Sequence, residues 1–288
     1  MTTIVRFTLL VALVAARAVA AQSTSSDTLP HAVSVESAPA TTFRGESSAA
    51  HMIHVDRRVA AGLVLGSLAL MPLDRQAESW LQHPGLQSSG PARSAAAAFN
   101  WIGGTGVLAG SAAALAVGRL TSNDRLSDVG LRATEAIVVS GAIVGATKGL
   151  AGRQRPFLEK NDPTDFFLGR GFGHGGLTSF PSGHTAAAFS AATVLSLEAR
   201  RSWPRAAPVI TPLLYGGATA VGLARMYDSK HWASDVALGA TIGTLSGIQV
   251  MRFNDAHPNN RLARLLTHAS VAPNGSRGIG IGLSLPLR

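Results

Sequence analysis

The stretch LRATEAIVVSGAIVGATKGLAG, residues 131–152, decides the fold class of this chain. It is too long for a strand and rich in alanine, so it predicts a helix. Comparable apolar runs occupy residues 57–71, 94–120, 182–201, 209–225 and 234–253. Strands are not expected among these runs. We therefore predict an all-α bundle of about six apolar helices within a domain of residues 51–255, with its site at helix ends and loops.

The composition indicates how much of the chain is buried and which classes of partner it can bind. The 288 residues are 46% hydrophobic and 14% charged, whereas soluble domains average about 25% charged residues. An unusual share of the chain is therefore buried, in a core or in lipid. The net charge of +9 favours anionic partners, but without a Lys/Arg run or a basic helix with aromatics we expect no nucleic acid. The lack of cysteine excludes disulfides and cysteine nucleophiles.

Both ends differ from the predicted bundle. Residues 1–21 have Arg6, an apolar run and a small-residue cleavage site, which predicts a signal peptide; an uncleaved anchor is the alternative. Residues 22–50 are rich in Ser, Thr, Ala and Pro and are interpreted as a flexible linker. In the basic tail, residues 256–288, Ile279, Ile281 and Leu283 alternate with small residues, which predicts a single edge strand; a disordered tail is the alternative.

Two polar segments at helix ends could bind an anion. Lys148 and Arg155 are seven residues apart, so in a helix they share one face. Pro181, Ser182 and Gly183 open the next helix, whose free N–H groups and dipole attract anions. A snorkelling lysine and an ordinary Ser-capped helix are the alternative interpretations.

A third segment carries Arg225, His231 and Asp235. His231 and Asp235 are four residues apart, and a carboxylate on one ring nitrogen leaves the other free as a nucleophile. Taken alone, this pair could also cap a helix. Together with His184, which lies in the first turn after Gly183, the three segments supply cations, a nucleophile and an acid. Phosphoryl transfer needs those groups.

The chain resembles the type 2 phosphatidic acid phosphatase superfamily in these segments. The matching patterns are K-x6-R-P, P-S-G-H and R-x5-H-x3-D, and the resemblance covers roughly residues 55–253. That superfamily includes bacterial acid phosphatases, membrane lipid phosphatases and vanadium haloperoxidases. One departure is Ala224, where the family often has Ser, so one hydroxyl contact to phosphate is expected to be missing.

The resemblance implies a role for each matching residue. His231 would attack phosphorus, Asp235 would orient it, and His184 would protonate the leaving oxygen. No metal or other cofactor is implied, and vanadate is expected to inhibit by resembling the transition state. The implied phosphate-binding residues are Lys148, Arg155, Ser182, Gly183 and Arg225.

We therefore expect a metal-independent phosphatase that acts on small or lipid phosphate monoesters through a phosphohistidine. One alternative is a haloperoxidase holding vanadate as its prosthetic group; another is a non-catalytic anion-binding membrane protein. The sequence favours an exported bundle, periplasmic or secreted, over a membrane-attached one. It leaves substrate identity and oligomeric state open.

Overall fold

A computed structural model describes residues 56–158, 162–257, 269–273 and 279–283. By its internal contacts the chain divides into two units, Met1–Gly62 and Leu63–Arg288. In the first unit the structure describes residues 56–62, where α2 (Arg57–Ala69) begins. The predicted signal peptide, residues 1–21, and the predicted linker, residues 22–50, lie outside the described residues.

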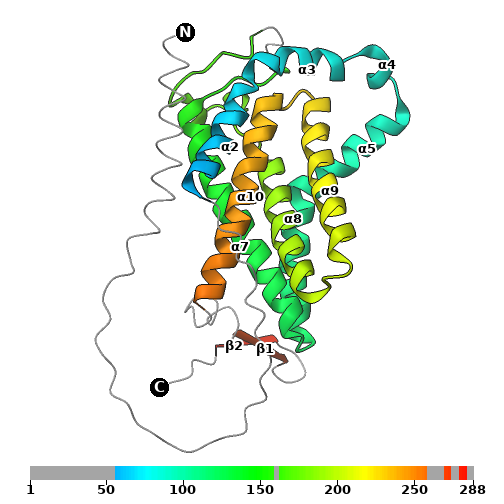
Figure 1. Cartoon of the computed structure of the whole chain (residues 1–288), viewed down its shortest axis with the longest axis vertical. Helices are drawn as coiled ribbons and strands as arrows, with labels where there is room; N and C mark the ends of the chain where they lie inside the picture. The colour runs from blue at the N-terminus through cyan, green and yellow to red at the C-terminus, as the bar shows by residue number, and fades with distance from the viewer. Residues whose placement is uncertain (1–55, 159–161, 258–268, 274–278, 284–288) are drawn as a thin grey trace, which may run out of the picture. The chain divides into compact units, whose positions relative to one another are not determined.

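The second unit is a bundle of long helices, which confirms the predicted all-α class (Figure 1). The predicted helix over residues 94–120 is one continuous element with a π-helical turn, Ile102–Gly106, in its middle. Three short helices between α2 and α5 were not predicted: a 3-10 helix (Met71–Leu73), α3 (Asp74–Leu81) and α4 (Pro84–Gln87). The long helices are α5 (Gly90–Trp101), α6 (Val107–Leu120), α7 (Asp124–Ala151), α8 (Gly183–Ser202), α9 (Ala207–Tyr227) and α10 (Ala233–Ala256).

Helix α8 packs against α7, α9 and α10. Glycines on α10 allow the closest of these approaches, since a Cβ at Gly239 would lie 2.5 Å from Ser182 O and one at Gly243 would lie 2.3 Å from Ala186 O. Such small residues at helical spacing let two backbones touch. The N-termini of α8 and α10, which carry His184 and Asp235, are thereby held together.

Four helical segments are long and apolar enough to cross a membrane: Gly90–Leu120, Asp124–Ala151, Ala207–Tyr227 and Ala233–Ala256. Large apolar side chains on them are exposed, including Leu120 at 72%, Leu213 at 70% and Val138 at 60%. Extended apolar surface of this kind marks contact with lipid or protein. It supports membrane association, the alternative that the sequence ranked second.

In the tail, β2 (Ile279–Leu283) coincides with the predicted strand. It is not single, because β1 (Ala269–Pro273) pairs with it antiparallel, with Val271 opposite Ile281. A lone strand leaves its backbone groups unpaired, and the second strand supplies their partners.

Candidate active site

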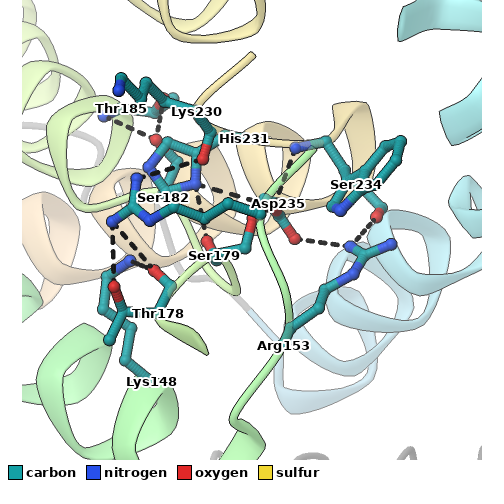
Figure 2. Close-up of polar contacts among 12 residues, drawn as sticks. Lys148, Arg153, Thr178, Ser179, Ser182, Thr185, Lys230, His231, Ser234 and Asp235 are labelled. Carbon is teal, nitrogen blue, oxygen red and sulfur yellow. Dashed lines mark hydrogen bonds and ion pairs between the residues drawn. The ribbon is translucent and has the colours of Figure 1, made fainter. Parts of the chain in front are cut away.

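The predicted site residues lie where α7 and α9 end and α8 and α10 begin. Figure 2 shows four of them, Lys148, Ser182, His231 and Asp235. Helix α7 ends at Ala151, and its C-cap residue, Gly152, has a φ of +59°; a Cβ on Gly152 would lie 1.9 Å from Phe167 O. Only glycine fits this left-handed, crowded position. The chain therefore turns at Gly152 and carries Arg153 and Arg155 back toward the starts of α8 and α10.

His231 is buried, with 2% of its surface exposed. Its Nδ1 lies 2.6 Å from Ser179 O and 3.6 Å from Asp235 Oδ2. A carbonyl can only accept, so Nδ1 donates its proton and Nε2 keeps a free lone pair. Burial lowers the pKa of His231 to about 3, and Lys148 and Arg155 add to this effect while Asp235 opposes it. The ring is therefore neutral at physiological pH, with the lone pair of Nε2 available.

Asp235 is fully buried at the start of α10 and does more than face His231. It accepts hydrogen bonds from Ser179 Oγ at 2.5 Å, from Trp232 N at 2.8 Å and from Arg153 Nη1 at 2.6 Å. Ser179 thus links the two residues, because its hydroxyl bonds to Asp235 while its carbonyl holds His231. Figure 2 shows Asp235 with His231 and Ser179 on one side and Arg153 on the other.

Arg153 is a site residue that the sequence did not identify. Its side chain has no exposed surface and forms ion pairs with Asp235 and, at 2.7 Å, with Asp74 of α3. Its guanidinium carbon lies 5.2 Å from the ring centre of Phe166 and 5.5 Å from that of Trp232. The sequence offers one hint of acidic partners nearby, which is the i,i+4 spacing of Asp74 and Glu78. Nothing in the sequence connects those two residues with Arg153 or with the third motif.

The three predicted phosphate-binding cations have no carboxylate partner within the described ranges. Lys148 Nζ donates to Thr178 O, and Arg155 Nη2 donates to Thr178 Oγ1 at 2.9 Å. Arg225 Nη1 donates to Asn100 Oδ1 at 3.1 Å. Its buried Nε has no hydrogen-bond partner among the residues that the structure describes. Their positive charge is therefore available to an anion.

The second motif opens α8 as predicted. Ser182 Oγ accepts from Thr185 N at 3.4 Å and bonds to Thr185 Oγ1 at 2.8 Å, so this hydroxyl caps the helix. A Cβ at Gly183 would lie 3.9 Å from Lys148 Cε, which places the lysine beside the helix N-terminus. Negative charge is stabilised at such a terminus.

His184 lies in the first turn of α8 and forms no hydrogen bond with the residues that the structure describes. Its pKa falls to about 4, first because of burial and then because of Arg225, Lys148 and Arg155. All three cations therefore act on one histidine. A bound anion would offset their charge and raise the pKa of His184 again.

The π-helical turn between α5 and α6 faces this histidine. A Cβ at Gly104 would lie 2.8 Å from His184 Nε2, so the turn brings bare backbone against the ring. On α5, Asn100 accepts from Arg225 and donates to Asp228 Oδ2 at 2.6 Å. π-Helical turns are frequent at functional sites. Neither residue was predicted.

The fold and the site together define an all-α protein that gathers two histidines and three cations without ion pairs at one end of a helical bundle. Residues 130–258 match the family model described as PAP2 superfamily. This segment contains every catalytic and phosphate-binding residue predicted above. Over residues 130–258 the chain is therefore similar to the PAP2 superfamily.

Two curated relatives match part of the chain. This chain is 36% identical over 113 residues to lipid A 1-phosphatase of Porphyromonas gingivalis, and the match covers 38% of this chain and 20% of that protein. This chain is 34% identical over 146 residues to lipid phosphate phosphatase 1 of Arabidopsis thaliana, and the match covers 43% of each of the two chains. The chain therefore spans less than half the length of either relative.

Solved structures resemble the fold. A transmembrane PAP2-type phosphatidylglycerolphosphate phosphatase from Bacillus subtilis matches with a TM-score of 0.53 at 18% identity, covering 70% of this chain and 98% of that one. LpxE of Aquifex aeolicus gives a TM-score of 0.46 at 24% identity, covering 62% of this chain and 95% of that one. The first likeness agrees with the helical bundle.

Proposed function

We propose that this chain is a membrane-associated, metal-independent phosphatase that hydrolyses lipid phosphate monoesters through a phosphohistidine. One observation carries the proposal: Lys148, Arg155 and Arg225 lack carboxylate partners in the described structure and all act on His184, and two of them also act on His231. Cations that form no ion pair, beside a neutral histidine with a free Nε2, suit a phosphate group and its in-line displacement.

The residues divide the reaction into two steps. The Nε2 lone pair of His231 attacks phosphorus, the P–O bond to the leaving group breaks, and His184 gives its proton to the leaving oxygen. His184 then takes a proton from water, whose oxygen attacks phosphorus and breaks the P–N bond, so inorganic phosphate leaves and His231 is restored. The Nδ1–H bond to Ser179 O stabilises the positive ring during the first step.

A lipid substrate is supported by the relatives and by the surface. Both curated relatives are named as phosphatases of lipids. Four helical segments can span a membrane, so a phosphate at the end of the bundle would lie near the headgroups of a bilayer.

We also propose that the site faces the exported side. The two short loops at the opposite end of the bundle are flanked by arginines: Arg119 and Arg125 around one, and Arg200, Arg201 and Arg205 around the other. Short loops rich in arginine favour the cytoplasmic side, although Arg75, Arg170 and Lys230 lie at the site end. Reaction with a membrane-impermeant phosphate ester supplied outside sealed cells tests this orientation, and turnover only after permeabilisation would refute it.

The test of the activity is phosphate release by the full chain from 4-nitrophenyl phosphate and from phosphatidate. We expect release by the wild type, loss in His231→Ala, inhibition by orthovanadate and no effect of EDTA. Release that is unchanged in His231→Ala, or absent from both substrates, would refute the proposal. Halide oxidation by a vanadate-loaded sample would identify the haloperoxidase alternative instead.

A further inference from the structure

Helix α3 presents a row of polar side chains toward the segment that carries the nucleophile. Asp74 and Glu78 lie on α3, and Gln82 is its C-cap residue. With spacings of four they lie on one face. Asp74 and Glu78 are buried, whereas Gln76 on the opposite face is exposed. Figure 1 shows α3 across the ends of α9 and α10.

Asp74 holds the third-motif aspartate through Arg153. It accepts from Arg153 Nη2 at 2.7 Å, from Ser234 N at 2.7 Å and from Ser234 Oγ at 2.5 Å. The other guanidinium nitrogen, Nη1, donates to Asp235 at 2.6 Å. A rigid planar fork thus fixes the distance between the two carboxylates.

Glu78 and Gln82 hold the loop just before His231. Glu78 Oε1 accepts from Ser229 Oγ at 2.7 Å, and Ser229 has a φ of +51° that a serine adopts only when held. Gln82 Nε2 donates to Tyr227 O at 2.9 Å, at the end of α9, where carbonyls lack helical partners. The row therefore contacts the chain at residues 227, 229 and 234, on both sides of His231.

We infer that Asp74, Glu78 and Gln82 of α3 are positioning residues that hold His231 and Asp235 in the geometry for attack on phosphorus. This inference rests on the proposed function. Residues 74–82 lie in the N-terminal half of the chain, outside residues 130–258, which match the family model. His231 lies in a short loop between two helices, and a loop needs such contacts to hold a nucleophile in place.

The experiment measures how fast the phosphoenzyme forms for each active site. The full chain in detergent is mixed with 32P-labelled phosphatidate, quenched on a millisecond scale, and assayed for acid-labile, alkali-stable label. The amplitude counts competent sites and the rate constant reports positioning. The variants are Glu78→Ala, Glu78→Gln, which keeps an acceptor for Ser229, Gln82→Ala, and Gln76→Ala as the control on the exposed face.

We expect Glu78→Ala and Gln82→Ala to lower the rate constant by about 10- to 100-fold, since a misplacement near 1 Å costs about 100-fold. KM should change by less than about threefold, because the phosphate-binding cations remain, and Glu78→Gln should recover most of the rate. Gln76→Ala should match the wild type. If Glu78→Ala fails to fold, Gln82→Ala carries the test.

Two outcomes separate the inference from the function beneath it. If the wild type forms phosphoenzyme and the Glu78 and Gln82 variants lose only amplitude, α3 stabilises the fold without positioning the nucleophile, and the inference is wrong. If the wild type turns over substrate without any labelled histidine, the proposed mechanism itself is wrong.

Discussion

Gly104 provides the sharpest test of His184 as the acid. A Cβ at this position would lie 2.8 Å from His184 Nε2, about 0.6 Å inside the 3.4 Å of an ordinary van der Waals contact. In Gly104→Ala the imidazole must therefore move by roughly half an ångström. Because a 1 Å misplacement costs about 100-fold, we expect kcat to fall by about tenfold for an ester with a poor leaving group.

The assay compares 4-nitrophenyl phosphate, whose leaving group needs little protonation, with an alkyl phosphate, whose leaving group needs much. Gly104→Ala should slow the alkyl ester by at least about fivefold more than the aryl ester. The matched control is Gly110→Ala on α6, where a Cβ meets nothing within 4 Å. Because the two esters are compared on the same variant, the ratio of their rates does not depend on how much of that variant is folded. Equal slowing of both esters would refute His184 as the acid.

Three further predictions follow from the same contacts. Arg153→Met leaves Asp74 and Asp235 buried without their cation and should cost about 3–5 kcal/mol in the free energy of unfolding, measured by denaturant titration; an unchanged midpoint would contradict the buried ion pairs. Gly243→Ala should lower the unfolding temperature although alanine favours helices, because its Cβ would lie 2.3 Å from a carbonyl of α8; a raised temperature would contradict this packing. Burial and three cations hold the pKa of His184 at about 4, and a bound phosphate dianion should raise that pKa. Because the acid must be protonated, kcat should fall as the pH rises through the raised pKa. A kcat that is flat from pH 5 to 9 would count against this scheme.

The long helices and the three motifs could be predicted from sequence because both depend on local patterns. An apolar run such as residues 131–152 predicts a buried helix, and Ser182 followed by Gly183 predicts the start of one. The π-helical turn was missed because Gly103 and Gly104 look like ordinary helix glycines until α8 and α9 are packed against them.

Helix α3 escaped prediction for a related reason. Its sequence, DRQAESWL, is short and polar, and it follows Pro72, so it has the composition of a loop. Its helical state is stabilised by tertiary contacts, with Asp74 bound to Arg153 and Glu78 to Ser229. Partners 79 and 151 positions away leave no local pattern in a single sequence.

Arg153 and Arg155 show why the roles of like residues cannot be assigned from a motif alone. Arg153 has no exposed surface and faces two carboxylates, so its charge is already compensated. Arg155, two residues later, has different partners and donates only to neutral acceptors, including Thr178 Oγ1 and Lys230 O. A bound phosphate would therefore be attracted by Arg155 and hardly at all by Arg153. The resemblance assigned the phosphate to Arg155, but the work of Arg153 depends on Asp74, and only the folded chain brings them together.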